Sequence, residues 1–277
     1  MIDVQKYQKI AAERRTDLIR MIHDGKGGHT GGSLSSVDIL VALYYHVMKR
    51  DPGNPDWADR DRFVLSKGHS VEGYYAILAD LGYFPKAELN SYGSFGTRLI
   101  GHPTTKVPGM EMNTGALGHG LPVSVGMALG QRMDGNGART FVLLGDGELG
   151  EGSVWEAAMA AGHYQLDNLV AIIDRNGLQI SGNTENVMSL EPLADKWRAF
   201  GWVVEEADGH DYEQLISLLS LKPHTSGRPL MIIARTTKGK GVSFMQNVAK
   251  WHHGVPDEDQ YRLALSELLP VEAEVSK

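Results

Sequence analysis

Residues 140–152 read TFVLLGDGELGEG. The first five are apolar or β-branched, which is typical of a strand buried inside a parallel sheet. The triplet Gly145-Asp146-Gly147 follows at once, and glycine lets a backbone turn sharply or approach a ligand closely. A solvated acidic loop would also explain this stretch, so its meaning depends on the rest of the chain.

The composition is that of a globular protein. Of the 277 residues, 42% are hydrophobic and 22% charged, enough to bury a sizeable core. The net charge of −7 argues against nucleic acid or an anionic membrane as the main partner. The absence of cysteine excludes disulfides and thiolate chemistry, and no segment has the pattern of a signal peptide or a membrane span. We therefore expect a soluble, cytoplasmic protein.

Strand and helix patterns alternate along the chain. Short apolar runs predict strands at 62–65, 140–144, 169–174, 202–205 and 230–235. Helical periodicity covers 4–23, 37–45 with Ser35 or Ser36 as its cap, 71–82, 121–134, 153–165, 190–200, 211–221 and 257–269. This order predicts an α/β fold, an open and mostly parallel sheet with helices on both faces, as a single domain over residues 1–277.

Ligands of such sheets bind beyond the carboxyl ends of the strands. The segments that follow the predicted strands are polar and rich in glycine: 66–69, 145–148, 175–179, 209–210 and 236–241. We therefore expect one site at that edge of the sheet.

Asp146 and Asn176 follow two strands that are neighbours in the sequence, 30 residues apart. One strand–helix–strand unit has this length, so both side chains can converge on one ion. Carboxylate and amide oxygens suit Mg²⁺ or Ca²⁺, and a single carboxylate leaves room for an anionic ligand. Backbone N–H groups at Gly147 and at the next helix start suit a phosphate.

Four histidines stand beside glycines in predicted loops: His29, His69, His102 and His119. Histidines gathered in a cleft suit proton transfer and hydrogen bonding to a polyhydroxylated substrate. A zinc site of three histidines stays conceivable, although no helical His-x-x-x-His pair is present. The phosphate loop GxxxxGK[ST] and the HExxH and GxSxG motifs are all missing, which weighs against nucleotide, zinc-hydrolase and serine-hydrolase chemistry.

The stretch GDGELGEGSVWEAAMAAGHYQLDNLVAIIDRNGLQISG, residues 145–182, resembles the thiamine diphosphate signature of transketolases. Five further strings resemble family motifs in the same order: GHTG at 28–31, RFVLSKGH at 62–69, GHP at 101–103, TGALG at 114–118 and WH at 251–252. The resemblance covers almost the whole chain and implies the thiamine diphosphate-binding fold of the diphosphate (PP) domain.

The resemblance implies a role for each matching residue. Asp146, Asn176 and the backbone carbonyl of Leu178 would hold Mg²⁺, or Ca²⁺ or Mn²⁺ in its place. The cofactor-binding residues would be His69, Gly115, Leu117, Gly147, Glu151, Asn176 and His252. The catalytic residues, which face the substrate or the reacting groups, would be His29, His69, His102 and His252. Glu151 and Glu156 also resemble family acids at the interface between the two halves of a transketolase site.

The chain departs from the family pattern at two histidines. His119 stands where the family more often has glutamine, and His253 interrupts the usual Trp-His-Gly string, so His252 or His253 can be the functional histidine. The resemblance gives Glu148 no role.

The largest departure is length, because only the first domain of a full transketolase is matched. The missing pyrimidine-binding domain supplies a glutamate that activates the cofactor, so we expect it on a separate chain, as in split transketolases, in an α2β2 assembly. The implied reaction moves a two-carbon ketol unit from a ketose phosphate to an aldose. We expect a place in carbohydrate metabolism such as the pentose phosphate pathway.

Two other functions stay open. The first is the α subunit of an E1-type 2-oxo acid decarboxylase, which shares the GDG motif and needs a β partner, although several histidines for sugar hydroxyls favour a transketolase. A non-catalytic protein that binds Mg²⁺ and a diphosphate group is the second alternative, and it would gain no activity from any partner chain.

Overall fold

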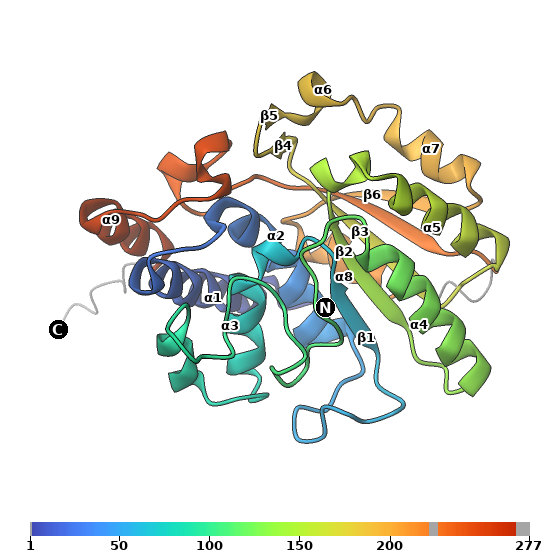
Figure 1. Ribbon diagram of the computed structural model, residues 1–277, viewed down its shortest axis with the longest axis horizontal. Helices are drawn as coiled ribbons and strands as arrows, with labels where there is room; N and C mark the ends of the chain where they lie inside the picture. The colour runs from blue at the N-terminus through green and yellow to red at the C-terminus, as the bar shows by residue number, and fades with distance from the viewer. Residues whose placement is uncertain (1, 222–226, 270–277) are drawn as a thin grey trace.

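The computed structural model describes residues 2–221 and 227–269, in which five strands form one parallel sheet (Figure 1). In chain order the strands are β1 (Arg62–Leu65), β2 (Thr140–Gly145), β3 (Leu169–Arg175), β6 (Val203–Asp208) and β7 (Leu230–Arg235). Their order in space is β1-β2-β3-β7-β6, and every neighbouring pair is parallel. All five carboxyl ends therefore meet at one edge of the sheet.

The five predicted strands are confirmed, with differences only at their ends. The largest difference is in β6, which begins one residue later than expected and continues to Asp208. It extends because β6 stays paired with β7 until Asp208 stands opposite Arg235. The prediction that Asp146 and Asn176 follow neighbouring strands is also confirmed, since β2 and β3 pair directly, with Gly145 opposite Asp174.

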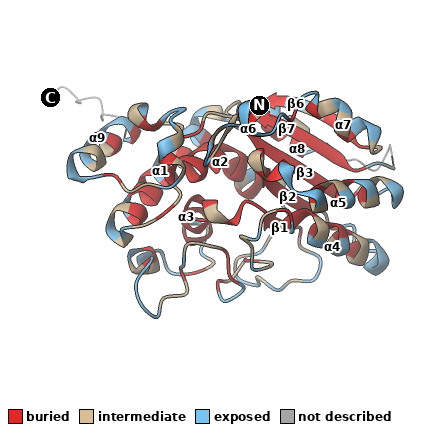
Figure 2. Ribbon diagram, turned by 45° about the horizontal axis from the view of Figure 1, so that its top comes forward, coloured by how far each residue is buried: buried red, intermediate tan, exposed pale blue. Residues whose placement is uncertain are grey.

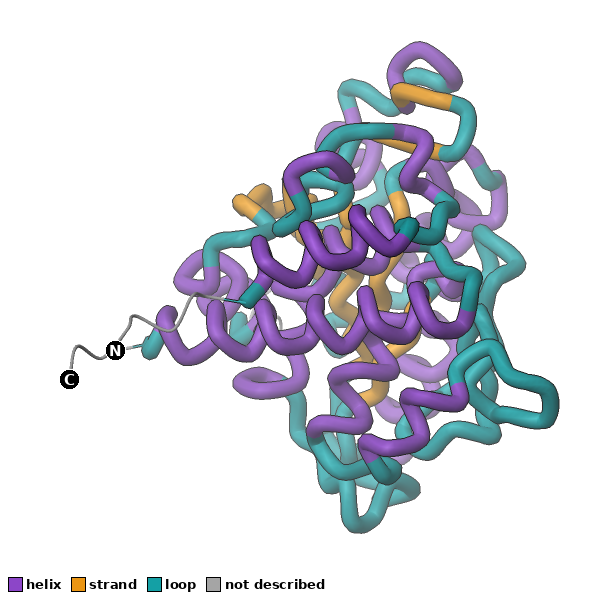
Figure 3. Tube along the Cα trace, turned by 90° about the vertical axis from the view of Figure 1, so that its left-hand side faces the viewer, coloured by secondary structure: helices purple, strands orange, loops and turns teal. Residues whose placement is uncertain are grey.

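Helices cover both faces of the sheet, as predicted (Figure 1). On one side of the sheet lie α1 (Val4–Gly25), α2 (Thr30–Ala42), α3 (Glu72–Asp80) and α8 (Tyr212–Leu219), and α9 (Glu258–Leu268) packs on α1. The other side carries α4 (Gly120–Asp134), α5 (Gly152–His163) and α7 (Leu193–Ala199). Seen from the side in Figure 3, the strands lie enclosed among helices.

Alternation along each strand builds the two halves of the core. Phe63, Phe141 and Ile172 point toward the α1–α3 side, whereas their successors Val64, Val142 and Ile173 point toward α4 and α5. All six are buried, and Figure 2 shows the central strands buried along their length. Each such side chain contributes roughly 1.5–3 kcal/mol of transfer free energy, which makes the sheet a rigid base for the loops at its edge.

The predicted start of the second helix is wrong. Neither Ser35 nor Ser36 is a cap, because α2 already begins at Thr30 with His29 as its N-cap residue. The Ser36 hydroxyl instead donates to the carbonyl of Gly32 at 2.9 Å, and the Ser35 hydroxyl donates to Asp174 Oδ2 at 2.6 Å. A serine can satisfy its hydroxyl in this way inside a helix, so the pattern of a cap is ambiguous in the sequence.

Several short elements connect the sheet to its helices. A hairpin of β4 (Leu178–Gln179) and β5 (Gly182–Asn183) follows β3, and α6 (Thr184–Val187) comes next. Short 3₁₀ turns include η2 (Gly68–Ser70), η3 (Lys86–Ser91), η4 (Gly147–Gly150), η6 (Ser243–Met245) and η7 (Ala249–His252), and η1 (Leu43–Val47) is a π-helical turn. No helix among the described residues is long and apolar enough to cross a membrane.

Gly162 of α5 packs against the end of α7, and a substitution there tests how closely these two helices pack. A Cβ atom there would lie 1.9 Å from the carbonyl oxygen of Phe200. We expect Gly162→Ala to lower the free energy of unfolding by about 3 kcal/mol, because backbone must move. Urea unfolding measures the change. The matched control is Gly126→Ala in α4, which meets nothing within 4 Å and should stabilise the chain by up to about 1 kcal/mol. Equal effects of the two substitutions would contradict the packing described.

Candidate active site

A cleft of about 300 Å³ opens at the carboxyl edge of the sheet, and Leu178 and Gln179 of the β4–β5 hairpin contribute to its lining. Figure 1 shows where this hairpin lies. The cleft is lined by residues that follow β1, β2, β3 and β7, together with the start of α2 and the 114–118 loop. The lining residues are His29, Lys67, His69, Gly115, Leu117, Gly145, Asp146, Gly147, Glu148, Asn176, Leu178, Gln179, Ile180, Lys238 and His252. Every predicted site residue except His102 and Glu151 lies in this group.

Asp146 is held in one orientation directly after β2. Its Oδ1 accepts from the Gly147 N–H at 2.8 Å, and its Oδ2 accepts from the Gly177 N–H at 2.6 Å and from Arg175 Nη1 at 3.3 Å. Burial raises the pKa of Asp146, and these donors act against that increase. Gly147 allows the close approach of the hairpin, since a Cβ atom there would lie 2.7 Å from Cβ of Gln179.

Asn176 and Leu178 supply two more oxygens on the same side of the cleft. Asn176 Oδ1 accepts from the Leu178 N–H at 3.1 Å, which fixes the amide. The Leu178 carbonyl accepts from Lys238 Nζ at 3.2 Å, so this oxygen already faces a positive charge. A carboxylate, an amide oxygen and a backbone carbonyl are ligands that Mg²⁺ and Ca²⁺ prefer, and the residues fit such an ion.

Glu148, which has no role assigned from the sequence, is a structural acid in the floor of the cleft. It is 2% exposed and accepts from the Gly118 N–H at 2.9 Å, the Gly145 N–H at 3.0 Å and the Ser66 hydroxyl. Burial raises its pKa, and these bonds oppose the change. Glu148 therefore joins the loops after β1 and β2 to the 114–118 loop.

Three histidines form one wall of the cleft. The ring centroids of His29 and His69 are 5.0 Å apart, and the ring of His252 stacks on His69 at 5.1 Å. His102 lies beside this wall and outside the cleft lining, with its ring 6.1 Å from His29 and packed against Gly115. A Cβ atom on Gly115 would lie 2.4 Å from the ring of His102, so glycine is needed there.

These imidazoles are held neutral. Burial, then the charges of neighbouring histidines and lysines, lowers the pKa of His29 to about 4. Burial and Lys238 likewise lower the pKa of His252 to about 3, and the pKa of His69 falls well below its usual range. Nδ1 of His29 is buried and has no hydrogen-bond partner among the described residues. A neutral imidazole with an unsatisfied polar atom, on a residue that lines the cleft, suits a hydroxylated ligand.

Two buried lysines were not assigned a role from the sequence, although both lie in the predicted post-strand segments. Lys67 and Lys238 are each 2% exposed. Lys67 pairs with the fully buried Asp174 and donates to the Gly32 carbonyl at 2.9 Å. Burial and the charge of Lys67 lower the pKa of Lys238 to about 8. No ion pair joins Lys238 to a carboxylate within the described ranges, so its charge is available to an anion in the cleft.

The remaining predicted residues lie around the cleft. Glu151 and Glu156 are exposed at the start of α5, outside the lining. His119 is exposed, with Nδ1 3.0 Å from the Leu117 carbonyl. His253 is exposed and its ring lies 4.7 Å from that of His29, but only His252 of the pair lines the cleft. The geometry therefore favours His252 over His253.

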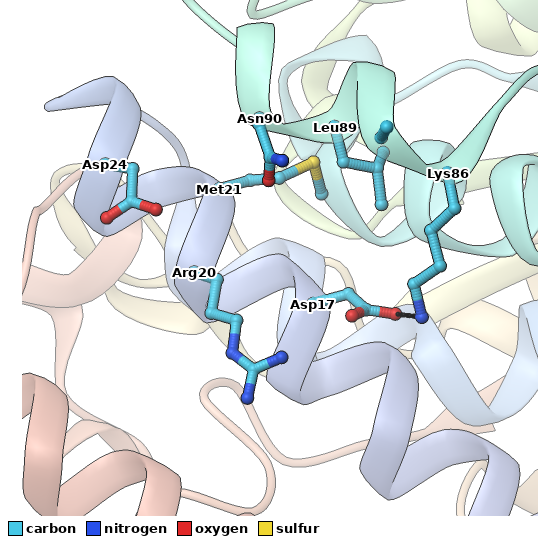
Figure 4. A pocket seen from close by; sticks show the side chains of 8 residues that line it. Asp17, Arg20, Met21, Asp24, Lys86, Leu89 and Asn90 are labelled. Carbon is cyan, nitrogen blue, oxygen red and sulfur yellow. Dashed lines mark ion pairs between the residues drawn. The ribbon is translucent and has the colours of Figure 1, made fainter.

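A second cavity of about 200 Å³ lies between α1 and η3, away from these residues (Figure 4). Two of its four charged lining residues pair with each other, since Lys86 Nζ lies 2.9 Å from Asp17 Oδ2. It contains none of the predicted site residues, and the cleft at the sheet edge remains the candidate site.

Comparisons with known proteins agree with this geometry. Residues 7–268 match the family model described as "Transketolase, thiamine diphosphate binding domain". The chain is 50% identical over 267 residues to an apulose-4-phosphate transketolase subunit of Phocaeicola vulgatus, covering 96% of this chain and 95% of that protein. It is 46% identical to the 6-deoxy-6-sulfo-D-fructose transketolase subunit SqwG of Clostridium sp. strain MSTE9, covering 94% of this chain and 97% of that one.

Solved transketolases share the fold. The enzyme of Leishmania mexicana matches with a TM-score of 0.89 and 34% identity over 97% of this chain, and that of Campylobacter jejuni with 0.90 and 32% over 96%. This chain spans only 41% and 43% of their lengths. It is therefore similar to nearly the whole of each split-enzyme relative and to one part of each solved enzyme.

The neutral state of His29 predicts a loss of stability in acid. Between its unfolded pKa of 6.5 and its folded pKa of about 4, the unfolded chain binds more protons than the folded chain. The stability that the folded state has from a neutral His29 is therefore present above pH 6.5 and is lost as the pH falls toward 4. After a discount for the partial exposure of His29, we expect the free energy of unfolding of the wild type to fall by about 1–2 kcal/mol more than that of His29→Asn between pH 6.5 and 4.5. Urea unfolding at both pH values measures this, with His163→Asn, an exposed histidine, as control. The same loss in wild type and His29→Asn would contradict it.

Proposed function

Because the chain belongs to the transketolase family, we propose that it is the thiamine diphosphate-binding subunit of an enzyme that moves a two-carbon ketol unit from a ketose to an aldose. The observation that carries this proposal is the pairing of an oxygen-lined wall with a buried cation in one cleft. Asp146, Asn176 and Leu178 form the wall, and Lys238 is the cation without a carboxylate partner among the described residues. A divalent metal and a diphosphate satisfy both sides together.

Each side of the cleft would hold one part of the cofactor complex. The oxygens of Asp146, Asn176 and Leu178 would bind the metal ion, and Lys238, His69 and His252 would donate to the diphosphate. Bound metal would favour the charged carboxylate of Asp146 against the burial that raises its pKa. Gly115 and Leu117 would pack against the middle of the cofactor.

The cofactor supplies the stabilisation of negative charge that carbon–carbon cleavage requires. The chain's own residues would bind the sugar and move protons. His29 and His69 enter the cleft as neutral imidazoles, able to accept a hydroxyl proton at one nitrogen while donating at the other. We propose the same function for His102, which would need substrate to reach past Gly115.

A partner chain would complete the site. Ile180 lines the cleft and is 71% exposed, and Met188 is 65% exposed on the segment that follows. Exposed apolar side chains at the mouth of a polar cleft suit coverage by another chain. We propose that a pyrimidine-binding subunit covers this side in an α2β2 enzyme, with residues 1–277 as the single diphosphate-binding domain. Glu151 and Glu156 would lie near that contact.

The substrate we propose is a ketose with an anionic group at its far end. The two relatives named above are described as acting on a ketose phosphate and a sulfonated ketose, and both names denote one subunit of a transketolase. These names favour a specialised sugar pathway over the pentose phosphate pathway. Cytoplasmic location remains a prediction from the cysteine-free composition.

Coexpression with a candidate pyrimidine-domain chain tests the function. The purified complex, loaded with thiamine diphosphate and Mg²⁺, should transfer a glycolaldehyde unit from at least one phosphorylated or sulfonated ketose to an aldehyde acceptor. Chromatography of the products measures this transfer. Either chain alone should be inactive. Release of CO₂ from 2-oxo acids would instead favour the E1-type alternative. No transfer by any intact, cofactor-loaded complex would refute the proposal and favour a non-catalytic binding protein.

The metal assignment predicts that Asp146→Ala abolishes Mg²⁺-dependent binding of thiamine diphosphate by the complex, a loss of more than about 100-fold in affinity by calorimetry. Asp146→Asn keeps an acceptor for the Gly177 N–H but removes the charge, so it should also lose binding while melting near the wild-type temperature. Asp134→Ala, at the exposed end of α4, is the control. Unchanged binding in Asp146→Ala would refute the metal assignment.

A further inference from the structure

His210 follows β6 in one of the glycine-containing segments at the sheet edge, but it does not line the cleft. It lies instead beside a separate cavity of about 260 Å³, together with Arg15, Asp38 and Tyr212. Its function is therefore not explained by direct contact with cofactor or substrate.

The hydrogen bonds of His210 determine which ring nitrogen carries the proton. The backbone N–H of Thr237 donates to Nε2 at 2.9 Å, so Nε2 must be the unprotonated nitrogen. Nδ1 then carries the proton and donates to Asp38 Oδ2 at 2.6 Å. Asp38 also accepts from Arg15 Nη2 at 2.6 Å and from the Tyr212 hydroxyl at 2.8 Å. A charged, fully bonded carboxylate thus fixes the ring from behind.

Thr237 precedes Lys238, the buried cation of the cleft. The turn that contains both is held at its other positions by the Asn247 N–H, which donates to the Lys238 carbonyl at 2.9 Å, and by the Gly239 N–H, which donates to the Gly31 carbonyl at 3.0 Å. Lys238 Nζ then reaches the Leu178 carbonyl at 3.2 Å and His252 Nδ1 at 3.1 Å. The direction of the lysine depends on where this backbone lies.

Gly209 brings the histidine close enough to act on the turn. A Cβ atom at Gly209 would lie 2.4 Å from Cγ2 of Thr236, so any larger residue would push the two segments apart. The Gly209 N–H also donates to the Arg235 carbonyl at 2.7 Å. The pair Gly209-His210 therefore fits the turn both sterically and by hydrogen bonding.

We infer that His210 is a positioning residue, which holds the Thr237 N–H through Nε2 and so directs Lys238 toward the diphosphate. This inference rests on the proposed function for the identity of the anion. The arrangement follows the general rule that side chains behind a binding group fix its orientation and contribute to affinity. Its distinctive claim is that the acceptor at Nε2 matters, rather than the hydrogen bond from Nδ1 to Asp38.

Two amide substitutions separate these contacts. The amide of glutamine reaches the position of Nε2, so His210→Gln keeps an acceptor for Thr237. The amide of asparagine reaches only the position of Nδ1, so His210→Asn keeps the donor to Asp38 and loses the acceptor. In the complex with Mg²⁺, we expect His210→Asn to weaken thiamine diphosphate binding by about 10-fold and His210→Gln by less than about 2-fold, measured by calorimetry.

A larger loss of affinity in His210→Gln than in His210→Asn would show that His210 acts through its hydrogen bond to Asp38, and would overturn the inference. Equal losses in the two variants would also overturn it. In a Lys238→Met background, His210→Asn should cause no further loss of affinity. A full additional loss there would show that His210 does not act through Lys238, and would also overturn it.

Measurements on the ligand-free full chain separate this inference from the proposed function. Imidazole ¹⁵N shifts should show His210 protonated at Nδ1, and amide hydrogen exchange of residues 236–239 should be faster in His210→Asn than in His210→Gln. The opposite tautomer or equal exchange would overturn the inference. A wild-type complex that binds no thiamine diphosphate would refute the proposed function, and the exchange comparison would still decide whether His210 anchors the turn.

Discussion

One buried carboxylate, that of Asp174 at the end of β3, joins four parts of the chain. It accepts hydrogen bonds from Lys67 after β1, from Ser35 of α2 at 2.6 Å, and from Thr236 after β7. Burial alone would raise its pKa, but the charge of Lys67 and the hydrogen bonds from Lys67, Ser35 and Thr236 together outweigh burial, and the pKa is lowered. Removing the ammonium of Lys67 would leave the buried charge of Asp174 unpaired, which would lower the free energy of unfolding by about 3–5 kcal/mol. The loops at the carboxyl edge of the sheet are therefore held together by electrostatics as well as by the apolar core.

This ion pair also sets the charge of the cleft. Lys67 is neutralised by Asp174, whereas Lys238 has no carboxylate partner in the part of the chain that the structure describes. Lys238 therefore remains a buried positive charge, close to the neutral rings of His29, His69 and His252. Asp146 lies in the same cleft, where the N–H groups of Gly147 and Gly177 and the guanidinium of Arg175 hold its carboxylate. An anion and a divalent cation bound together would balance the charges of Lys238 and Asp146, and this is the physical basis of the proposed diphosphate and metal site.

The limits of prediction differ from one residue to the next. Asp146 and Asn176 could be predicted because parallel strands place their carboxyl ends together, so position in the sequence fixes position at the edge. Lys67, Lys238 and His210 also stood in the post-strand segments, but nothing in their spacing shows which of them faces the cleft, pairs with Asp174 or anchors a turn. Glu148 had no assigned role because its partners, Ser66 and Gly118, are distant in the sequence. Ser35 and Ser36 were predicted as caps because a serine inside a helix and one at its start have the same local pattern.

The sequence by itself determined the succession of strands and helices along the chain, the family and the edge of the sheet at which the site lies. It did so because strand and helix periodicity and short motifs are local properties of the chain. Only the tertiary structure decided that His252 rather than His253 lines the cleft, that His102 lies outside the lining, and that Lys238 is a buried cation without a carboxylate partner among the described residues. Those facts depend on which distant segments meet and on which side chains burial leaves without a partner, and no local pattern contains that information.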